Sequence, residues 1–140
     1  MPSDLLFTKL LYLTTKFKTI KARCNGKNLE LMVADTTAKK MLGLMHRKVL
    51  PKNKGMLFIF NKAGKYDIWM LNMKFPIDIL WLDSKSRVIK IIENAEPCSS
   101  FFRCVPYNSP PKAMYIIELN AGASRKNSIR KGSRFSFQKT

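Results

Sequence analysis

Three polar side chains lie within or beside apolar runs of the sequence and are the first candidates for chemistry. Asp78 stands in the run 77–82, where strand alternation places it on the same face as two leucines. A carboxylate that is partly buried there has a pKa that desolvation raises and hydrogen-bond donors lower. Such a group is either a functional site or a structural anchor. Asn72 and Pro76 nearby favour an anchor that holds the link between two strands through backbone N–H groups.

Glu118 lies between Ile117 and Leu119 near the end of a predicted strand. Alone it is compatible with a surface position. If Asn72, Asp78 and Glu118 converge, they form a polar pocket that could bind a small ligand or a cation. A small-ligand-binding or enzymatic β domain built on this pocket is one of two functional hypotheses.

No set of residues for covalent catalysis is apparent. His46 is the single histidine, it borders a positively charged loop, and no sequence spacing fixes its distance to a cysteine. Cys24, Cys98 and Cys104 lack the paired close spacing of a zinc site. We therefore predict no catalytic residues, no metal and no cofactor.

The charge is unusually positive: 26 Lys and Arg against 9 Asp and Glu give a net charge of +17 over 140 residues. Most of the excess lies on either side of the middle of the chain, and the segment 61–94 is nearly balanced. The flanking clusters comprise Lys48, Lys52, Lys54, Arg125, Lys126, Arg130, Lys131, Arg134 and Lys139. Two such clusters beside a compact β body are what binding to a phosphate backbone would use.

The leading hypothesis is therefore a non-enzymatic binding module that contacts nucleic acid, either structured RNA or a ribonucleoprotein surface. One competing interpretation is that the lysines are only solvated. Another is a surface binder of acidic membranes that uses residues 1–16, which place apolar side chains at helical spacing. That segment could equally be a helix lying on the core, the most common outcome for an amphipathic segment, or an arm for a partner.

The elements that must position these side chains are short strands. Residues 1–16 form an amphipathic extension, and 17–140 form a single compact β domain. Asn25-Gly26 predicts a tight hairpin turn, and Asp35-Thr36-Thr37 predicts the N-terminal cap of a short helix over 38–45, in which Gly43 indicates close packing or an early end. The expected strands cover 17–24, 29–34, 55–60, 65–71, 77–82, 87–92, 112–119 and 133–139. This pattern predicts a mainly β fold, a small antiparallel barrel or sandwich with one short helix.

The expected cellular compartment depends on three sequence features: membrane-spanning runs, signal peptides and cysteine content. No apolar run approaches the roughly 20 residues that span a bilayer, and Lys9 interrupts the apolar N-terminus, so we expect neither a transmembrane segment nor a signal peptide. Three cysteines are too few for a disulfide scaffold, although Cys98 and Cys104 could bridge if their loop folds back. The expected location is the cytoplasm.

Several motifs in order resemble a known family. They are Gly43-Leu44-Met45 with Arg47, Gly55 to Phe58 with Phe60, Trp69-Met70 with Asn72, Pro76 with Asp78-Ile79, Pro97-Cys98, Tyr107, Pro110, and Tyr115 to Gly122 with Glu118-Leu119. Over residues 28–138 the sequence is similar to the bacterial and archaeal family called domain of unknown function 192. The resemblance implies a compact, mostly β domain and brings no established activity. The chain departs from the family at Met73, where relatives usually have threonine, and at Ser133, where they have an acidic residue.

Overall fold

The computed structural model describes residues 5–98 and 100–139, the side chain of Lys139 excepted. The elements in order are α1 (Leu5–Thr14), β1 (Thr19–Cys24), β2 (Lys27–Ala34), α2 (Thr37–Leu42), β3 (Lys54–Gly64), β4 (Ile77–Leu82), β5 (Val88–Ala95), the 3₁₀ turn η1 (Phe101–Arg103), β6 (Ala113–Asn120), α3 (Ala123–Lys126) and β7 (Ser136–Lys139). The prediction of a mainly β fold is confirmed.

One mixed sheet holds all seven strands of the described residues in the order β5-β4-β6-β3-β2-β1-β7. β2 and β3 pair in parallel, and every other neighbouring pair is antiparallel. The parallel pair exists because residues 35–53, including α2, carry the chain back across the sheet before β3 begins. The purely antiparallel arrangement expected from sequence therefore does not occur.

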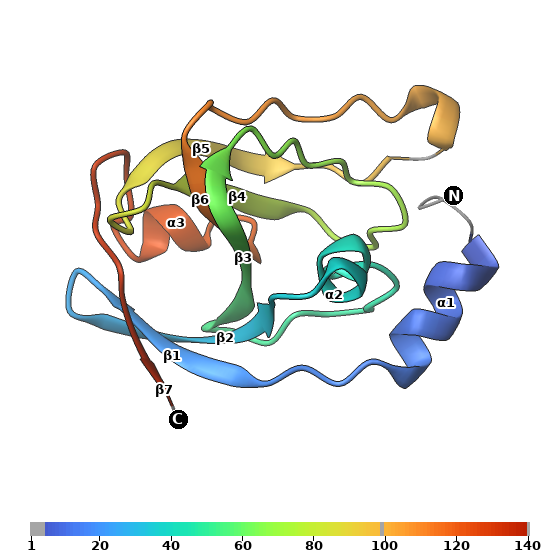
Figure 1. Ribbon diagram of the computed structural model, residues 1–140, viewed down its shortest axis with the longest axis horizontal. Coiled ribbons are helices and arrows are strands. Elements are labelled where there is room, and N and C mark those ends of the chain that lie inside the picture. Colours follow the sequence, from blue (N-terminus) through green and yellow to red (C-terminus); the bar gives the residue numbers. More distant parts are fainter. Residues whose placement is uncertain (1–4, 99, 140) are drawn as a thin grey trace.

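The sheet is not closed into a barrel, although its last segment links the two edges. β7 pairs with β1, and just before it Arg134 forms an isolated bridge with Arg87 next to β5. Because residues 133–139 divide their backbone hydrogen bonds between β1 and residues 86–88 at the start of β5, no continuous ladder closes the sheet. Figure 1 shows this terminal segment passing from the α3 side of the molecule to β1.

Alternation along the strands separates two apolar cores, one on each face of the sheet. The first contains Met56, Phe58, Ile79 and Trp81 and is covered by α2 and the long loops. The second contains the intervening residues of the same strands, together with Phe135. Every residue of β4 is buried because this strand is covered on both faces.

Local signals explain where several elements begin and end. The β1–β2 turn uses positive φ angles at Asn25 and Gly26, as the tight turn requires. Thr36 caps α2 by accepting a hydrogen bond from the Lys39 N–H at 3.2 Å. The helix ends at Gly43, whose φ of 50° suits glycine and whose missing side chain admits the Phe58 ring.

Two predicted elements differ in the structure. The range 65–71 is not a strand: Ile68 alone forms a bridge, to Tyr107, because β3 continues to Gly64 and the following residues cross the first core as a loop. The N-terminal helix α1 does not lie with its leucines on the core. Thr8 is buried in it, while Leu6 and Leu13 are 69% and 74% exposed. It rests beside α2 instead, as Figure 1 shows.

Candidate functional site

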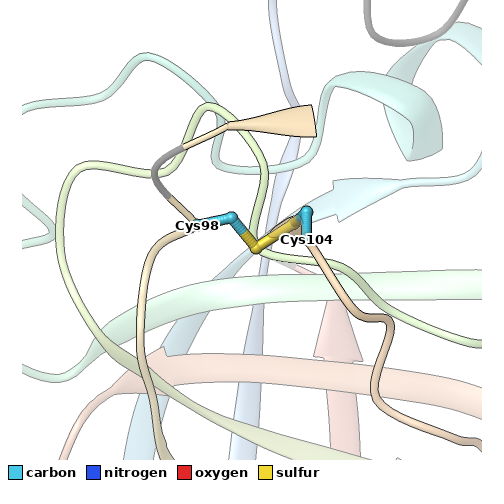
Figure 2. Close-up of a disulfide and its surroundings, with 2 residues drawn as sticks. All are labelled: Cys98 and Cys104. Atoms are coloured by element: carbon cyan, nitrogen blue, oxygen red, sulfur yellow. A yellow bond between two sulfur atoms is a disulfide. The ribbon is translucent and has the colours of Figure 1, made fainter. Parts of the chain in front are cut away.

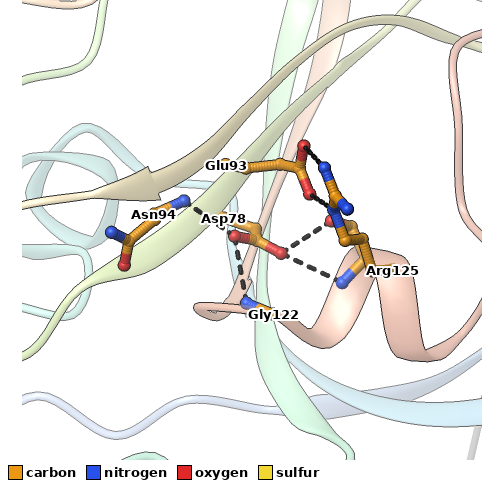
Figure 3. Close-up of polar contacts among 6 residues, drawn as sticks. Asp78, Glu93, Asn94, Gly122 and Arg125 are labelled. Atoms are coloured by element: carbon orange, nitrogen blue, oxygen red, sulfur yellow. Dashed lines mark hydrogen bonds and ion pairs between the residues drawn. The ribbon is translucent and has the colours of Figure 1, made fainter.

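Asp78 is a fully buried carboxylate that holds two connections together. Its Oδ1 accepts hydrogen bonds from the N–H of Asn94 at 3.0 Å and of Gly122 at 3.3 Å. Its Oδ2 accepts from the N–H and the hydroxyl of Ser124, at 3.0 and 2.7 Å. Figure 3 shows the carboxylate lying between the β5 backbone and the start of α3. With four donors satisfied, Asp78 has the surroundings of a structural anchor.

The sheet register places Asp78 and Glu118 on opposite faces. Glu118 in β6 pairs with Ile79 in β4, so those two side chains point to one face and Asp78, one residue earlier, points to the other. Asn72 lies elsewhere, where its side chain donates to the Met45 sulfur at 3.8 Å and its carbonyl accepts from the His46 N–H. The structure therefore does not bring Asn72, Asp78 and Glu118 into one pocket.

Glu118 lines a different pocket, of about 160 Å³, on the first core face. The other walls come from α2 and the turn after it, from Phe58 in β3, and from the segment 67–73. Glu118 is 4% exposed, and its carboxyl has no hydrogen-bond or ion-pair partner among the described residues. Burial raises the pKa of this carboxyl to about 8.

Asp67 is a second carboxylate lining the pocket that sequence reasoning missed. It lies in a segment predicted as a strand, where alternation gave no reason to separate it from surface residues. The structure fixes it through a hydrogen bond from the Ser109 N–H at 2.8 Å and an ion pair with Lys65 at 3.6 Å.

Some of the predicted basic residues converge and others do not. Lys52 and Lys54, before and at the start of β3, line one pocket together with Lys126 at the end of α3. Lys27 joins them, because its Nζ donates to the Lys126 carbonyl at 2.9 Å. Side-chain contact with Lys52, the charge of Lys52, desolvation and then the charge of Lys27 lower the pKa of Lys126.

A row across three strands extends this patch. Lys21 in β1 pairs with Glu30 in β2, which pairs with Lys54 in β3, and a groove beside the row includes Arg23. Glu30 forms an ion pair with Lys54 at 3.2 Å and is the acid within the row. The basic surface is defined by Lys21, Arg23, Lys27, Lys52, Lys54 and Lys126. The alternation of cationic and apolar residues along β1 was the sequence signal that could have identified Lys21 and Arg23 as part of the basic surface.

The remaining predicted cations lie apart from the basic surface. Arg125 forms an ion pair with Glu93, its Nε lying 2.7 Å from the carboxylate, as Figure 3 shows. Arg130 and Lys131 line a groove along β5, and Arg134 stands opposite Arg87. Lys48 is exposed but lines none of these grooves. The side chain of Lys139 lies outside the described part of the chain.

The cysteines and the histidine have structural contacts. Cys98 and Cys104 form a disulfide, shown in Figure 2, and Cys24 is buried as a free thiol. His46 is buried with its Nε2 at 2.8 Å from the Thr8 hydroxyl, which fastens α1, and desolvation and the charges of Lys74 and Lys9 lower its pKa. Within residues 5–98 and 100–139 no three His, Cys, Asp or Glu side chains could hold a metal ion, and no helix is long and apolar enough to cross a membrane.

Comparison with protein families gives a match over residues 19–137 to the family model DUF192, described as uncharacterised ACR. The chain belongs to the DUF192 family. The match begins just after α1, so the paired sheet and both cores constitute the DUF192 domain. Several residues of the family resemblance, Gly43, Met45, Phe58, Trp69 and Glu118, line the 160 Å³ pocket of this DUF192 protein.

Two solved structures resemble this DUF192 protein. A protein of Sinorhizobium meliloti 1021, provisionally named a transcription regulator, is 28% identical with a TM-score of 0.78, and the alignment covers 88% of this chain and 96% of that one. A protein of unknown function from Novosphingobium aromaticivorans DSM 12444 is 25% identical with a TM-score of 0.73, covering 84% of this chain and 83% of that one. No curated protein matches the chain.

Proposed function

We propose that this DUF192 protein is a non-enzymatic binding module whose basic surface contacts the phosphate backbone of nucleic acid, either structured RNA or RNA in a ribonucleoprotein. The observation that carries the proposal is the convergence of Lys52 and Lys126. They come from different segments, 74 positions apart in the sequence, and line one pocket. Ammonium groups held this close repel one another, and a phosphate between them would relieve the repulsion.

The lining of the two adjoining grooves supports the same partner. Lys52, Asn53 and Lys54 are shared by both grooves, so the cations form one continuous strip from β1 to α3. Asn28 also lines it and supplies an amide donor suited to phosphate or sugar oxygens. Backbone contacts of this type carry no base sequence information, so we expect weak sequence preference and strong salt dependence.

We propose that the protein acts in the cytoplasm, where RNA is accessible. A reducing compartment would keep many cysteine pairs as thiols, and Cys98–Cys104 is the pair that would respond. In Figure 1 the η1 loop between these cysteines lies on the side of the view opposite the β1–β2 turn and α3. We therefore expect nucleic-acid binding to be independent of the redox state of this pair.

Filter binding with a structured RNA and a DNA duplex tests the proposal through two charge-matched variants. Lys52→Glu with Lys126→Glu reverses two charges in the basic surface. Lys62→Glu with Lys112→Glu makes the same change in net charge on exposed lysines at the far end of β3 and β6, roughly 25 Å from Lys54. We expect the first pair to weaken RNA binding at least tenfold more than the second.

Equal losses in both double variants would mean that only net charge matters, and would contradict a defined basic surface. Absence of RNA and DNA binding by the wild type near physiological salt would contradict the function itself. Co-sedimentation with anionic vesicles in place of RNA binding would favour an acidic membrane as the partner.

A further inference from the structure

The pocket beside Glu118 is lined by a carboxyl group that has no hydrogen-bond or ion-pair partner among the residues that the structure describes. The pocket, about 160 Å³, lies between the end of α2, the segment 67–73 and the sheet. Across the sheet, Glu118 is flanked by Met56 on one side and Ile79 on the other, both fully buried. Glu118 is 4% exposed, and its carboxyl oxygens retain access to the pocket, where a ligand can supply the hydrogen bonds that the described residues do not.

The walls of the pocket define the shape of that ligand. Met45, Phe58 and Trp69 present thioether and aromatic surface, and Gly43, just after α2, lets the Phe58 ring pack against the backbone. A volume of this size is comparable with an apolar cavity that holds about one benzene-sized group. The pocket therefore suits a short apolar stem with one polar end.

The charges around the pocket define the polar end. Lys40 and Asp67 are the other titratable groups lining it, on α2 and on the segment before Trp69. Lys40 is directed elsewhere: its Nζ donates to the Ile59 carbonyl at 3.1 Å and lies 4.6 Å from the centre of the Phe60 ring. The side chains facing Glu118 from β3 and β4 are apolar, and Asp67 already pairs with Lys65 at 3.6 Å and accepts from the Ser109 N–H. Glu118 therefore mainly sets the preference of the pocket for a hydrogen-bond donor.

We propose that this pocket binds a primary ammonium group on a short aliphatic stem, with Glu118 as the buried counter-ion and Asp67 as a second acceptor. An ammonium group supplies three donors and a positive charge, and neighbouring aromatic faces such as Trp69 favour cations. The same chemistry occurs in a free alkylamine and in a lysine side chain of a peptide. The site lies on the first core face and is independent of the basic surface.

Binding is coupled to a proton. Because burial raises the Glu118 pKa to about 8, the carboxyl is largely protonated at neutral pH and loses its proton when an ammonium group enters. The amine itself remains charged, with a pKa near 10. We therefore expect the affinity to increase by up to about tenfold per pH unit between pH 6 and 8, and one proton to be released per ligand at pH 7.

Isothermal titration calorimetry with pentylamine as the probe tests this inference. Pentylamine should bind to the intact chain, 1-pentanol and pentanoic acid should not, and repeating the titration in two buffers of different ionisation enthalpy should reveal the released proton. Glu118→Gln keeps the shape but cannot ionise, and we expect at least tenfold weaker binding. Glu96→Gln, which removes an exposed carboxyl, is the matched control and should bind as the wild type does.

A blocked lysine, N-acetyl-lysine methylamide, distinguishes the two sources of the ammonium group. Tighter binding than pentylamine assigns the pocket to a peptide side chain, and weaker binding assigns it to a free amine. No binding of either probe, equal binding of 1-pentanol, or unchanged binding by Glu118→Gln would overturn the inference. Circular dichroism of each variant verifies that it is folded.

Discussion

Asp78 and Glu118 are both buried carboxyl groups, and their surroundings assign them different roles. Asp78 receives four hydrogen bonds, three of them from the loop and first turn around Gly122 and Ser124. Glu118 receives none from the described residues and lines a pocket. A carboxylate that is satisfied by the fold contributes to stability, whereas one without partners is available for a ligand.

Replacing Asp78 by Asn should destabilise the fold. The side-chain NH2 group of asparagine cannot accept hydrogen bonds from the surrounding N–H and O–H groups. Buried donors would then be unpaired, at a cost of about 3 kcal/mol. Urea unfolding measures this loss, and Asp35→Asn, an exposed position, serves as the control. A variant as stable as the wild type would contradict the anchor role.

Glu118 should make stability depend on pH. Its folded-state pKa, about 8, is above its ordinary value of 4.5, so the folded protein holds a proton that the unfolded chain releases in this range. Stability is therefore greatest below about pH 4.5 for this group and falls as pH rises towards 8, by on the order of 3 kcal/mol between pH 5 and 7.5.

Glu118→Gln should remove this part of the pH dependence, because glutamine does not titrate. Free energies of unfolding at pH 5 and 7.5, compared with those of Glu96→Gln, measure the difference. If wild type and Glu118→Gln lose the same stability between these pH values, Glu118 is not the protonated buried group.

At the scale of elements, the loop 96–107 supports one wall of the ammonium pocket. The Cys98 N–H donates to the Met70 carbonyl, Ile68 and Tyr107 exchange backbone hydrogen bonds, and Trp69 packs edge-on against Phe101. The disulfide between Cys98 and Cys104 closes this loop, as Figure 2 shows. Its reduction should therefore loosen the loop and the segment 67–73 before the sheet.

Replacing both Cys98 and Cys104 by serine should lower the free energy of unfolding by about 2 kcal/mol, as expected for a short closed loop. The RNA affinity should not change, since the basic surface uses none of these residues. Denaturation and filter binding of the double variant measure the two effects. Loss of RNA binding in a folded variant would contradict the separation of the two sites.

The sequence predicted the positions of most strands better than it predicted which strands pair with each other. The turn at Asn25-Gly26 and the cap at Thr36 are local, so their residue types were sufficient. The parallel pairing of β2 with β3 and the loop character of 65–71 depend on contacts between distant segments. The exposed leucines of α1 follow from docking through Thr8 and His46, which no periodicity indicates.

The candidate site shows the same limit. Alternation placed Asp78 on a face of β4, but which face Glu118 occupies depends on the register of β4 with β6, and a shift of one residue would reverse it. Asp67 and Lys27 were missed because each acquires its role only when the chain folds back on it.

At the scale of the whole molecule, two kinds of electrostatic interaction act on a polyanion. A net charge of +17 acts on any polyanion at long range, while the basic surface brings cations from β1, β2, the loop before β3, the start of β3 and α3 into one strip. Long-range attraction mainly affects association rate, and direct phosphate contacts determine how many counterions are released. The number of released counterions therefore distinguishes a defined surface from diffuse charge.

The most direct test of the central claim is the salt dependence of RNA affinity, measured between 50 and 200 mM salt for the wild type and the Lys52→Glu, Lys126→Glu variant. If the basic surface neutralises about six phosphates, log affinity should fall against log salt with a slope of roughly −4 to −5, and the variant should be shallower by about one to two. A wild-type slope shallower than about −2, or identical slopes in the two proteins, would contradict phosphate binding by this surface.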